Sequence, residues 1–228
     1  RKKVMSVVFV GPGAPVKQGI VTSVEKRPEA VTGVSLASID YCEPARQLLL
    51  YKPSAKRVLI PFFPYAGAGV VEQTATETAR YLEMQGRTVT LLPLYELSEV
   101  QGKIKAFMPH VDTVVCLESC AIAQANAVLV KLCDQYHVTL FAGDAQSVLL
   151  DGAALGYGVF AQELGVRALR VAYEVLLNGM YPGDIPVIRI DGCRQAIVNE
   201  SAAAMQGLPL TPNLQRLIEA QGGAARWS

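Results

Sequence analysis

The stretch that decides the fold runs from Thr113 to Phe141 and reads TVVCLESCAIAQANAVLVKLCDQYHVTLF. It opens with the apolar run Thr113–Leu117 and closes with the apolar run Val138–Phe141. Neither run alternates with polar residues, which is typical of parallel strands covered on both faces. Between them, apolar residues at helical spacing predict a helix over Cys120–Gln135, namely Ala121, Ala125, Val128, Leu129 and Leu132. The stretch therefore predicts a strand–helix–strand unit with parallel strands.

The same alternation of apolar runs and helical periodicity continues on both sides of this unit. Further strands are predicted at Val4–Val10, Ala30–Leu36, Arg57–Phe62, Thr88–Pro93 and Pro186–Ile190. Further helices are predicted at about Pro15–Glu25, Glu43–Leu50, Val71–Gln85, Ser98–Phe107 and Gln162–Asn178, the last followed by Gly179 as its C-cap. This order indicates the α/β class with a doubly wound parallel sheet, in one open sheet or in two lobes.

The composition excludes several classes of protein. The chain has 228 residues, of which 51% are apolar and 18% are charged, and its formal net charge is +1. A disordered chain would be poorer in apolar residues, and a nucleic-acid-binding protein would carry a basic surplus. No apolar stretch reaches the roughly 18 residues of a membrane-spanning helix. Residues 1–10 begin like a signal peptide but stop at Gly11-Pro12-Gly13, so we interpret them as a buried strand, with any signal removed before this numbering begins.

The cysteines are predicted to be free thiols of the core. Their odd number does not fit a disulfide framework: Cys42, Cys116, Cys120, Cys133 and Cys193. Cys116-x3-Cys120 followed by Cys133-x3-His137 is close to zinc-finger spacing. However, a helix between Cys120 and Cys133 would separate them by about 20 Å, whereas zinc ligands lie about 2.3 Å from one ion. We therefore expect no metal.

Three glycine motifs approach the dinucleotide-binding fingerprint, and each departs from it. The departures are Val16 after Gly11-x-Gly13, Glu72 after Gly67-x-Gly69, and the lack of an acidic residue about 20 positions beyond Gly156-x-Gly158-x-x-Ala161. We interpret these glycines as tight turns between strands and helices, and expect no cofactor. A nucleotide-dependent α/β enzyme stays an alternative that would need this damaged fingerprint.

Catalytic groups are not predicted by any other motif. His110 and His137 each precede a predicted strand, so they should lie at the amino ends of the sheet, away from the usual ligand edge of α/β folds. The sequon Asn199-Glu200-Ser201 fits an N-cap of the helix that starts near Ser201. We therefore expect a protein that is not an enzyme.

The loops after the predicted strands carry the candidate ligand-binding residues. Carboxyl ends of parallel strands share one edge, where open α/β sheets bind ligands. Small residues, hydroxyl groups and the N–H groups of helix starts suit a small polar ligand there. Ser119 and Asp144 fit a purely structural role as N-caps equally well. The candidates in these loops are Gly13, Tyr65, Gly67, Ala68, Glu118, Ser119, Cys120 and Asp144.

Several segments also match, in order and spacing, the motifs of one known family. Val111–Val115 is similar to that family's "vDaiyv" strand, and Glu118-Ser119-Cys120 stands at its "D-N-T". Phe141–Val148 is similar to "F-A-S-D-x-x-S-V". Leu177-Asn178-Gly179 with Pro182–Val187 resembles "L-x-G-x-x-P-x-D-I-P-V", and Val31–Ser35 matches "N-V-T-G-V-S". Over nearly its whole length the chain thus resembles the ABC-transporter substrate-binding proteins that include tryptophan- and phenylalanine-type receptors.

The resemblance implies a type I periplasmic-binding fold, in which two α/β lobes close on a ligand at the carboxyl ends of their strands. By analogy, residues 1–52 and 152–185 would form lobe I, and residues 53–151 and 186–228 would form lobe II. Members of the family have additional βα units before the strand at Val4, so the first lobe is expected to be incomplete. The strand edge exposed in this way would favour a homodimer.

The resemblance also implies a function. It predicts a solute-binding protein, or a sensor domain derived from one, that holds an amino-acid-like ligand outside the cytoplasm or in the periplasm, with an ABC permease or a membrane sensor as partner. Ser119 and Cys120 amides would hold the ligand's anionic group, Asp144 would accept from a donor, and Tyr65 and Phe160 would pack on its apolar part. The family has carboxylates where this chain has Ala14 and Phe160. A truncated receptor that acts as an interaction or structural protein is therefore an alternative.

Overall fold

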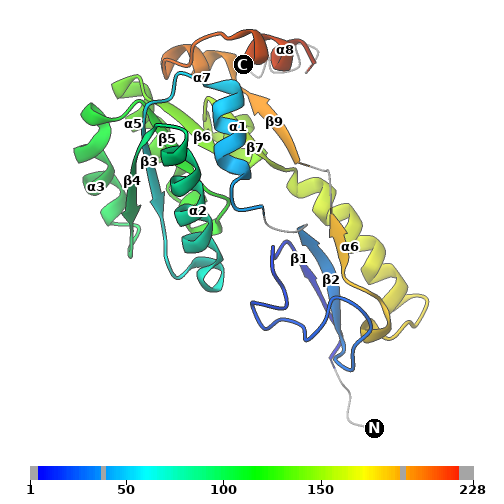
Figure 1. Cartoon of the computed structure of the whole chain (residues 1–228). Coiled ribbons are helices and arrows are strands. Elements are labelled where there is room, and N and C mark those ends of the chain that lie inside the picture. Colours follow the sequence, from blue (N-terminus) through cyan, green and yellow to red (C-terminus); the bar gives the residue numbers. More distant parts are fainter. Residues whose placement is uncertain (1–4, 37–39, 191–193, 221–228) are drawn as a thin grey trace. The chain divides into compact units, whose positions relative to one another are not determined.

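The computed structural model describes residues 5–36, 40–190 and 194–220 (Figure 1). The chain divides into two compact units. Unit 1 comprises Arg1–Asp40 and Val159–Arg194, and unit 2 comprises Tyr41–Gly158 and Gln195–Ser228. The strand pairs recorded in both units are parallel, which confirms the predicted α/β class. Val4 and Cys193, which the sequence predictions included, lie outside the described residues.

Unit 1 contains a three-stranded sheet in the order β1-β2-β8. Its elements are β1 (Val7–Val10), β2 (Val31–Leu36), α6 (Ala161–Leu176), the 3-10 turn η4 (Pro182–Asp184) and β8 (Ile188–Ile190). Helix α6 packs on β1 and β2, and its Val171 shares a small core with Val34 and Ile190. The helix predicted at Pro15–Glu25 is wrong, because this segment forms turns. Gly19 adopts a φ of +69° there, and apolar Val16 and Ile20 are exposed while Val21 is buried, so no continuous apolar face exists.

Unit 2 is built on a six-stranded sheet in the order β4-β3-β5-β6-β7-β9. Its strands are β3 (Arg57–Phe62), β4 (Thr88–Pro93), β5 (Thr113–Cys116), β6 (Thr139–Ala142), β7 (Leu155–Val159) and β9 (Arg194–Val198). Every residue of β5 and β6 is buried, as expected for strands covered on both faces. Two strands, β7 and β9, were not predicted.

Helices cover both faces of this sheet (Figure 1). On one face, α1 (Glu43–Tyr51) and α2 (Val70–Met84) place Leu48 and Leu82 in the cluster that contains Val58. On the other, α3 (Glu99–Phe107) contacts α5 (Asn126–Tyr136), which packs on β6. The remaining elements are η1 (Ala66–Gly69), η2 (Met108–His110), α4 (Cys120–Ala123), the π-turn η3 (Ser147–Asp151), α7 (Glu200–Met205) and α8 (Pro212–Ala220). The single helix predicted over Cys120–Gln135 is thus divided into α4 and α5.

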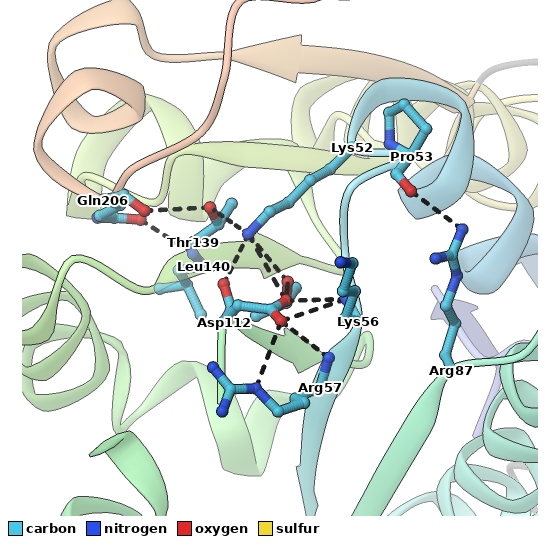
Figure 2. A network of polar contacts seen from close by, with 10 residues as sticks. Lys52, Pro53, Lys56, Arg57, Arg87, Asp112, Thr139, Leu140 and Gln206 are labelled. Atoms are coloured by element: carbon cyan, nitrogen blue, oxygen red, sulfur yellow. Dashed lines mark hydrogen bonds and ion pairs between the residues drawn. The ribbon is translucent and has the colours of Figure 1, made fainter. Parts of the chain in front are cut away.

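A buried lysine joins several elements at the amino edge of this sheet (Figure 2). Lys52, at the end of α1, is 4% exposed. Its Nζ donates to the Asp112 carbonyl oxygen at 2.6 Å, to Thr113 Oγ1 at 3.0 Å and to Thr139 Oγ1 at 2.8 Å. The Asp112 carboxylate accepts the backbone N–H groups of Lys56 and Arg57. These bonds fix the end of α1 to the first residues of β3, β5 and β6.

This arrangement predicts a pH dependence of stability. Burial lowers the pKa of Lys52 from 10.5 to about 8, because loss of solvation outweighs the nearby Asp112 carboxylate. Between these pH values the unfolded chain binds a proton that the folded chain has lost, so stability should rise with pH. The difference in unfolding free energy between the wild-type chain and Lys52→Met should therefore shift in favour of the wild type by about 2–3 kcal/mol when the pH is raised from 7 to 10. Urea unfolding of both chains at each pH measures this difference, and a difference that does not change with pH would contradict the prediction.

Candidate functional site

Three segments meet at the carboxyl edge of the sheet in unit 2. Gly143 follows β6, and a Cβ on it would lie 2.3 Å from the Glu118 backbone nitrogen in the loop after β5. A Cβ on Gly158 in β7 would lie 2.6 Å from Asp144 Cα. Such distances are possible only because these residues are glycines. The backbones of all three segments are therefore in direct contact, and they bring Glu118, Ser119 and Asp144 to one place.

The third glycine motif has its explanation in this contact. Gly156 and Gly158 lie inside strand β7, not in a loop that opens a helix. A Cβ on Gly156 would lie 2.7 Å from the Asp144 carbonyl oxygen. The interpretation of these two glycines as a strand-to-helix turn is therefore wrong, because they allow close packing of β7 against the loop after β6.

Asp144 is the best-defined polar group of this edge. Its Oδ1 accepts the Ser147 N–H at 2.7 Å, and its Oδ2 accepts the Ser147 hydroxyl at 2.6 Å. Buried Asn126 in turn donates from Nδ2 to Ser147 Oγ at 2.7 Å and to Asp151 at 2.8 Å. Asp144 therefore caps a short helical turn, and its predicted role in ligand binding stays a prediction. A carboxylate has about four acceptor positions, so these two bonds leave capacity for another donor.

The loop after β5 has a similar capping arrangement. Ser119 Oγ accepts the Ala121 N–H at 3.3 Å and caps α4, which begins at Cys120 and is a single turn. Glu118 is exposed beside it. At the end of β5, burial and the Asp144 carboxylate raise the pKa of the Cys116 thiol, and burial also raises the pKa of Cys133. Both are therefore neutral thiols of the core, as the sequence predicted.

The loop after β3 has an unusual backbone. Gly67, Ala68 and Gly69 are consecutive residues with φ values of +61°, +53° and +82°. For alanine the left-handed region costs about 1–2 kcal/mol, so Ala68 is strained. The loop presents Tyr65, an exposed side chain whose ring lies 5.7 Å from that of Phe63.

A second exposed tyrosine at this edge was missed by the sequence analysis. Tyr95 follows β4, which pairs with β3. Its N–H donates to Glu99 at 2.9 Å, and the Lys103 ammonium, paired with Glu99 at 2.9 Å, lies 5.9 Å from the Tyr95 ring centroid. The hydrogen bonds from Tyr95 and Lys103 lower the pKa of Glu99. The sequence feature that could have identified Tyr95 as a site residue is its position, two residues after the apolar run that forms β4.

The other predicted site residues belong to unit 1. Gly13 is half-buried in the loop after β1, where the Pro12 carbonyl accepts from Ser35 Oγ at 2.8 Å. Phe160 is half-buried and precedes the first residue of α6.

The residues excluded from the site lie where the sequence placed them. His110 and His137 are exposed and precede β5 and β6. Asn199 Oδ1 accepts the Ala202 N–H at 3.0 Å, which confirms it as the cap of α7. Within the described ranges, no helix has both the length and the apolar character needed to cross a bilayer.

Comparisons with known proteins place the chain in a family. A sequence model described as "ABC transporter substrate binding protein" matches residues 1–220, whereas no curated protein matches. A conserved domain protein from Vibrio cholerae is similar at 20% identity and a TM-score of 0.80, over 94% of this chain and 71% of that one. The ABC domain in complex with L-Trp from Streptococcus pneumonia is similar at 18% identity and a TM-score of 0.78, over 92% of this chain and 70% of that one. A ligand-free, open substrate-binding protein with adhesive properties from Clostridium difficile is similar at 21% identity and a TM-score of 0.63, over 91% of this chain and 68% of that one.

At these identities the solved structures establish the type I periplasmic-binding fold. The match over residues 1–220 shows that the chain belongs to the ABC transporter substrate-binding protein family.

Proposed function

We propose that this chain is a solute-binding protein that captures a small, amino-acid-like ligand outside the cytoplasm and delivers it to an ABC permease or a membrane sensor. Family membership supports a binding role rather than catalysis. The observation that carries the proposal is the contact of the loops after β5 and β6, which collects Glu118, Ser119 and Asp144 at the edge where α/β sheets bind ligands.

The proposed contacts divide by chemistry. The backbone N–H groups at Ser119 and Cys120 would donate to the ligand's anionic group, and Asp144 would accept from an ammonium or hydroxyl group. Tyr65, with Tyr95 on the neighbouring loop, would pack on the apolar part. Gly67 and Ala68 would let the ligand approach the backbone after β3. Gly13 and Phe160 belong to unit 1 and stay predicted ligand contacts.

A receptor-derived interaction protein is the second candidate. The observation that favours it is the engagement of both Asp144 oxygens by Ser147, which accounts for this carboxylate without any ligand. Both candidates share the fold, and they differ in whether a small molecule stabilises the chain.

A ligand screen tests the proposed function. Thermal unfolding should be followed with aromatic and branched amino acids, including L-tryptophan, and with tryptamine and indole-3-propionate, which lack its carboxylate and its ammonium group. A ligand at 100 times its Kd adds about 2.7 kcal/mol of stability. No stabilisation by any compound, together with no small molecule in native mass spectra of the purified chain, would favour the second candidate.

Two substitutions separate ligand binding by Asp144 from capping. Asp144→Ala removes the cap and should cost about 1 kcal/mol of stability, whereas Asp144→Asn keeps the acceptor for the Ser147 N–H, loses only the one for the Ser147 hydroxyl, and should cost less than Asp144→Ala. If Asp144 holds a ligand ammonium group, Asp144→Asn should weaken binding at least tenfold in calorimetric titrations. Equal affinity in the wild type and Asp144→Asn would exclude that role.

A further inference from the structure

The turn after helix α6 contains the one Asn–Gly pair of the sequence, Asn178-Gly179. The residues that follow the other three asparagines are Ala127, Glu200 and Leu214. The backbone nitrogen of a residue can attack the side-chain amide of an asparagine before it, and a side chain on the attacking residue hinders this approach. Because glycine has no Cβ, the attack meets the least steric resistance at Asn178.

The structure leaves the two reacting groups accessible. Asn178 and Gly179 are exposed and lie beyond Leu176, the last residue of α6. Gly179 has a φ of +69°, a left-handed conformation that is common for glycine after a helix. Within residues 5–36, 40–190 and 194–220, its N–H has no hydrogen-bond acceptor. The Gly179 nitrogen is therefore not held away from the Asn178 side chain, whose Nδ2 donates to Glu174 at 2.7 Å.

Unit 2 contains groups of the same kind that are restrained. Gly152 follows Asp151 at the end of η3, and its N–H donates to the Ser147 carbonyl oxygen. Asn126 is buried and donates from Nδ2 to the Ser147 hydroxyl at 2.7 Å and to Asp151 at 2.8 Å. The Gly152 nitrogen and the Asn126 amide thus have structural roles that the groups after α6 lack.

We propose that Asn178 is a site of spontaneous deamidation, which weakens the end of α6. Hydroxide removes the Gly179 amide proton, and the nitrogen attacks Cγ of Asn178. As the new C–N bond closes a succinimide ring, the bond from Cγ to Nδ2 breaks, and Nδ2 takes a proton from water and leaves as ammonia. Water then opens the ring at one of its two carbonyl carbons and leaves aspartate or isoaspartate. Nothing is oxidised or reduced, and water is the co-reactant.

The product is unfavourable at the end of α6. The new carboxylate would stand four residues after Glu174, where like charges repel, and at the negative end of the helix dipole. Isoaspartate also adds one carbon to the main chain before Met180, whose N–H donates to the Glu174 carbonyl oxygen at 3.1 Å. Because Val175 packs against the core of unit 1, we expect the change to lower the stability of this unit.

Peptide mass spectrometry after incubation at 37 °C, at pH 7 and at pH 9, tests the reaction. The peptide that contains Asn178 should gain the mass difference between oxygen and NH, faster at pH 9 because hydroxide removes the proton. It should then separate into an aspartate and an isoaspartate form. The peptides that contain Asn126, Asn199 and Asn213 are internal controls and should keep their mass.

Two variants test the effect on the fold. Asn178→Gln keeps an amide but would need a larger ring, so its peptide should not change on incubation. Asn178→Asp carries the product charge and should melt at a lower temperature than Asn178→Gln. The incubated wild-type chain should also melt at a lower temperature than before, whereas incubated Asn178→Gln should not. Deamidation of Asn178 no faster than that of Asn213, a rate that does not rise with pH, or equal melting temperatures of the two variants would each overturn the proposal.

Discussion

Replacing Gln206 by leucine is expected to lower the free energy of unfolding of unit 2 by about 4 kcal/mol. Gln206 is fully buried beyond the end of α7. Its Oε1 accepts the backbone N–H groups of Leu140 at 3.0 Å and Ala154 at 3.2 Å, and its Nε2 donates to Asp134 at 2.8 Å and to the Gly152 carbonyl at 2.9 Å. Leucine has a similar volume but leaves these groups without their partner. Each unsatisfied buried group costs about 1–3 kcal/mol.

The measurement is urea unfolding followed by circular dichroism, with Gln215→Leu as the control. Gln215 is exposed on α8, so the same change there should alter stability by less than about 0.5 kcal/mol. Hydrogen exchange adds a local readout, because the amides of Leu140 and Ala154 should lose protection in Gln206→Leu. Equal stability of the two variants would show that water replaces the glutamine, and would contradict the prediction.

The sequence predicted those strands whose residues favour a strand locally. Arg57–Phe62 and Thr88–Pro93 are found as predicted, because both are rich in the β-branched and apolar residues that favour strands, whether buried as in β3 or at the sheet edge as in β4. Strand β7 was missed because LGYGV contains two glycines, which are unfavourable in strands. Glycines are needed at these two positions because the loop after β6, a separate segment of the sequence, packs directly against them. Local periodicity does not contain that information.

The candidate site was predictable to a similar extent. Both Ser119 and Asp144 stand just after apolar runs and are found as caps, as a local rule indicates. The burial of Lys52 could not be predicted from its neighbours in the sequence, because a lysine followed by proline is typical of an exposed loop. Its burial depends on acceptors supplied by Asp112, Thr113 and Thr139, which are distant in the sequence. The division of the helix at Gln124–Ala125 likewise accompanies a long-range contact, the bond from Asn126 to Ser147.

Gly143→Ala is expected to destabilise unit 2 by about 3 kcal/mol and to disrupt the candidate site. The added Cβ would lie 2.3 Å from the Glu118 nitrogen, 2.8 Å from the Leu117 carbonyl carbon and 2.9 Å from Glu118 Cα. All three are backbone atoms, so relief requires one of the two loops to move. The cost is steric, because Gly143 is not among the residues with positive φ.

The control variant for this substitution is Gly102→Ala. Gly102 lies within α3, where an added Cβ meets no atom within 4 Å, so alanine should stabilise by about 0.5–1 kcal/mol through its higher helix propensity. The two glycine substitutions, identical in chemistry, should thus move the urea midpoint in opposite directions. Because Gly143→Ala separates Ser119 from Asp144, any ligand found in the screen should bind it at least tenfold more weakly, while Gly102→Ala should bind like the wild type. A stable Gly143→Ala variant with unchanged affinity would show that the contact between the two loops neither supports the fold nor forms the binding site.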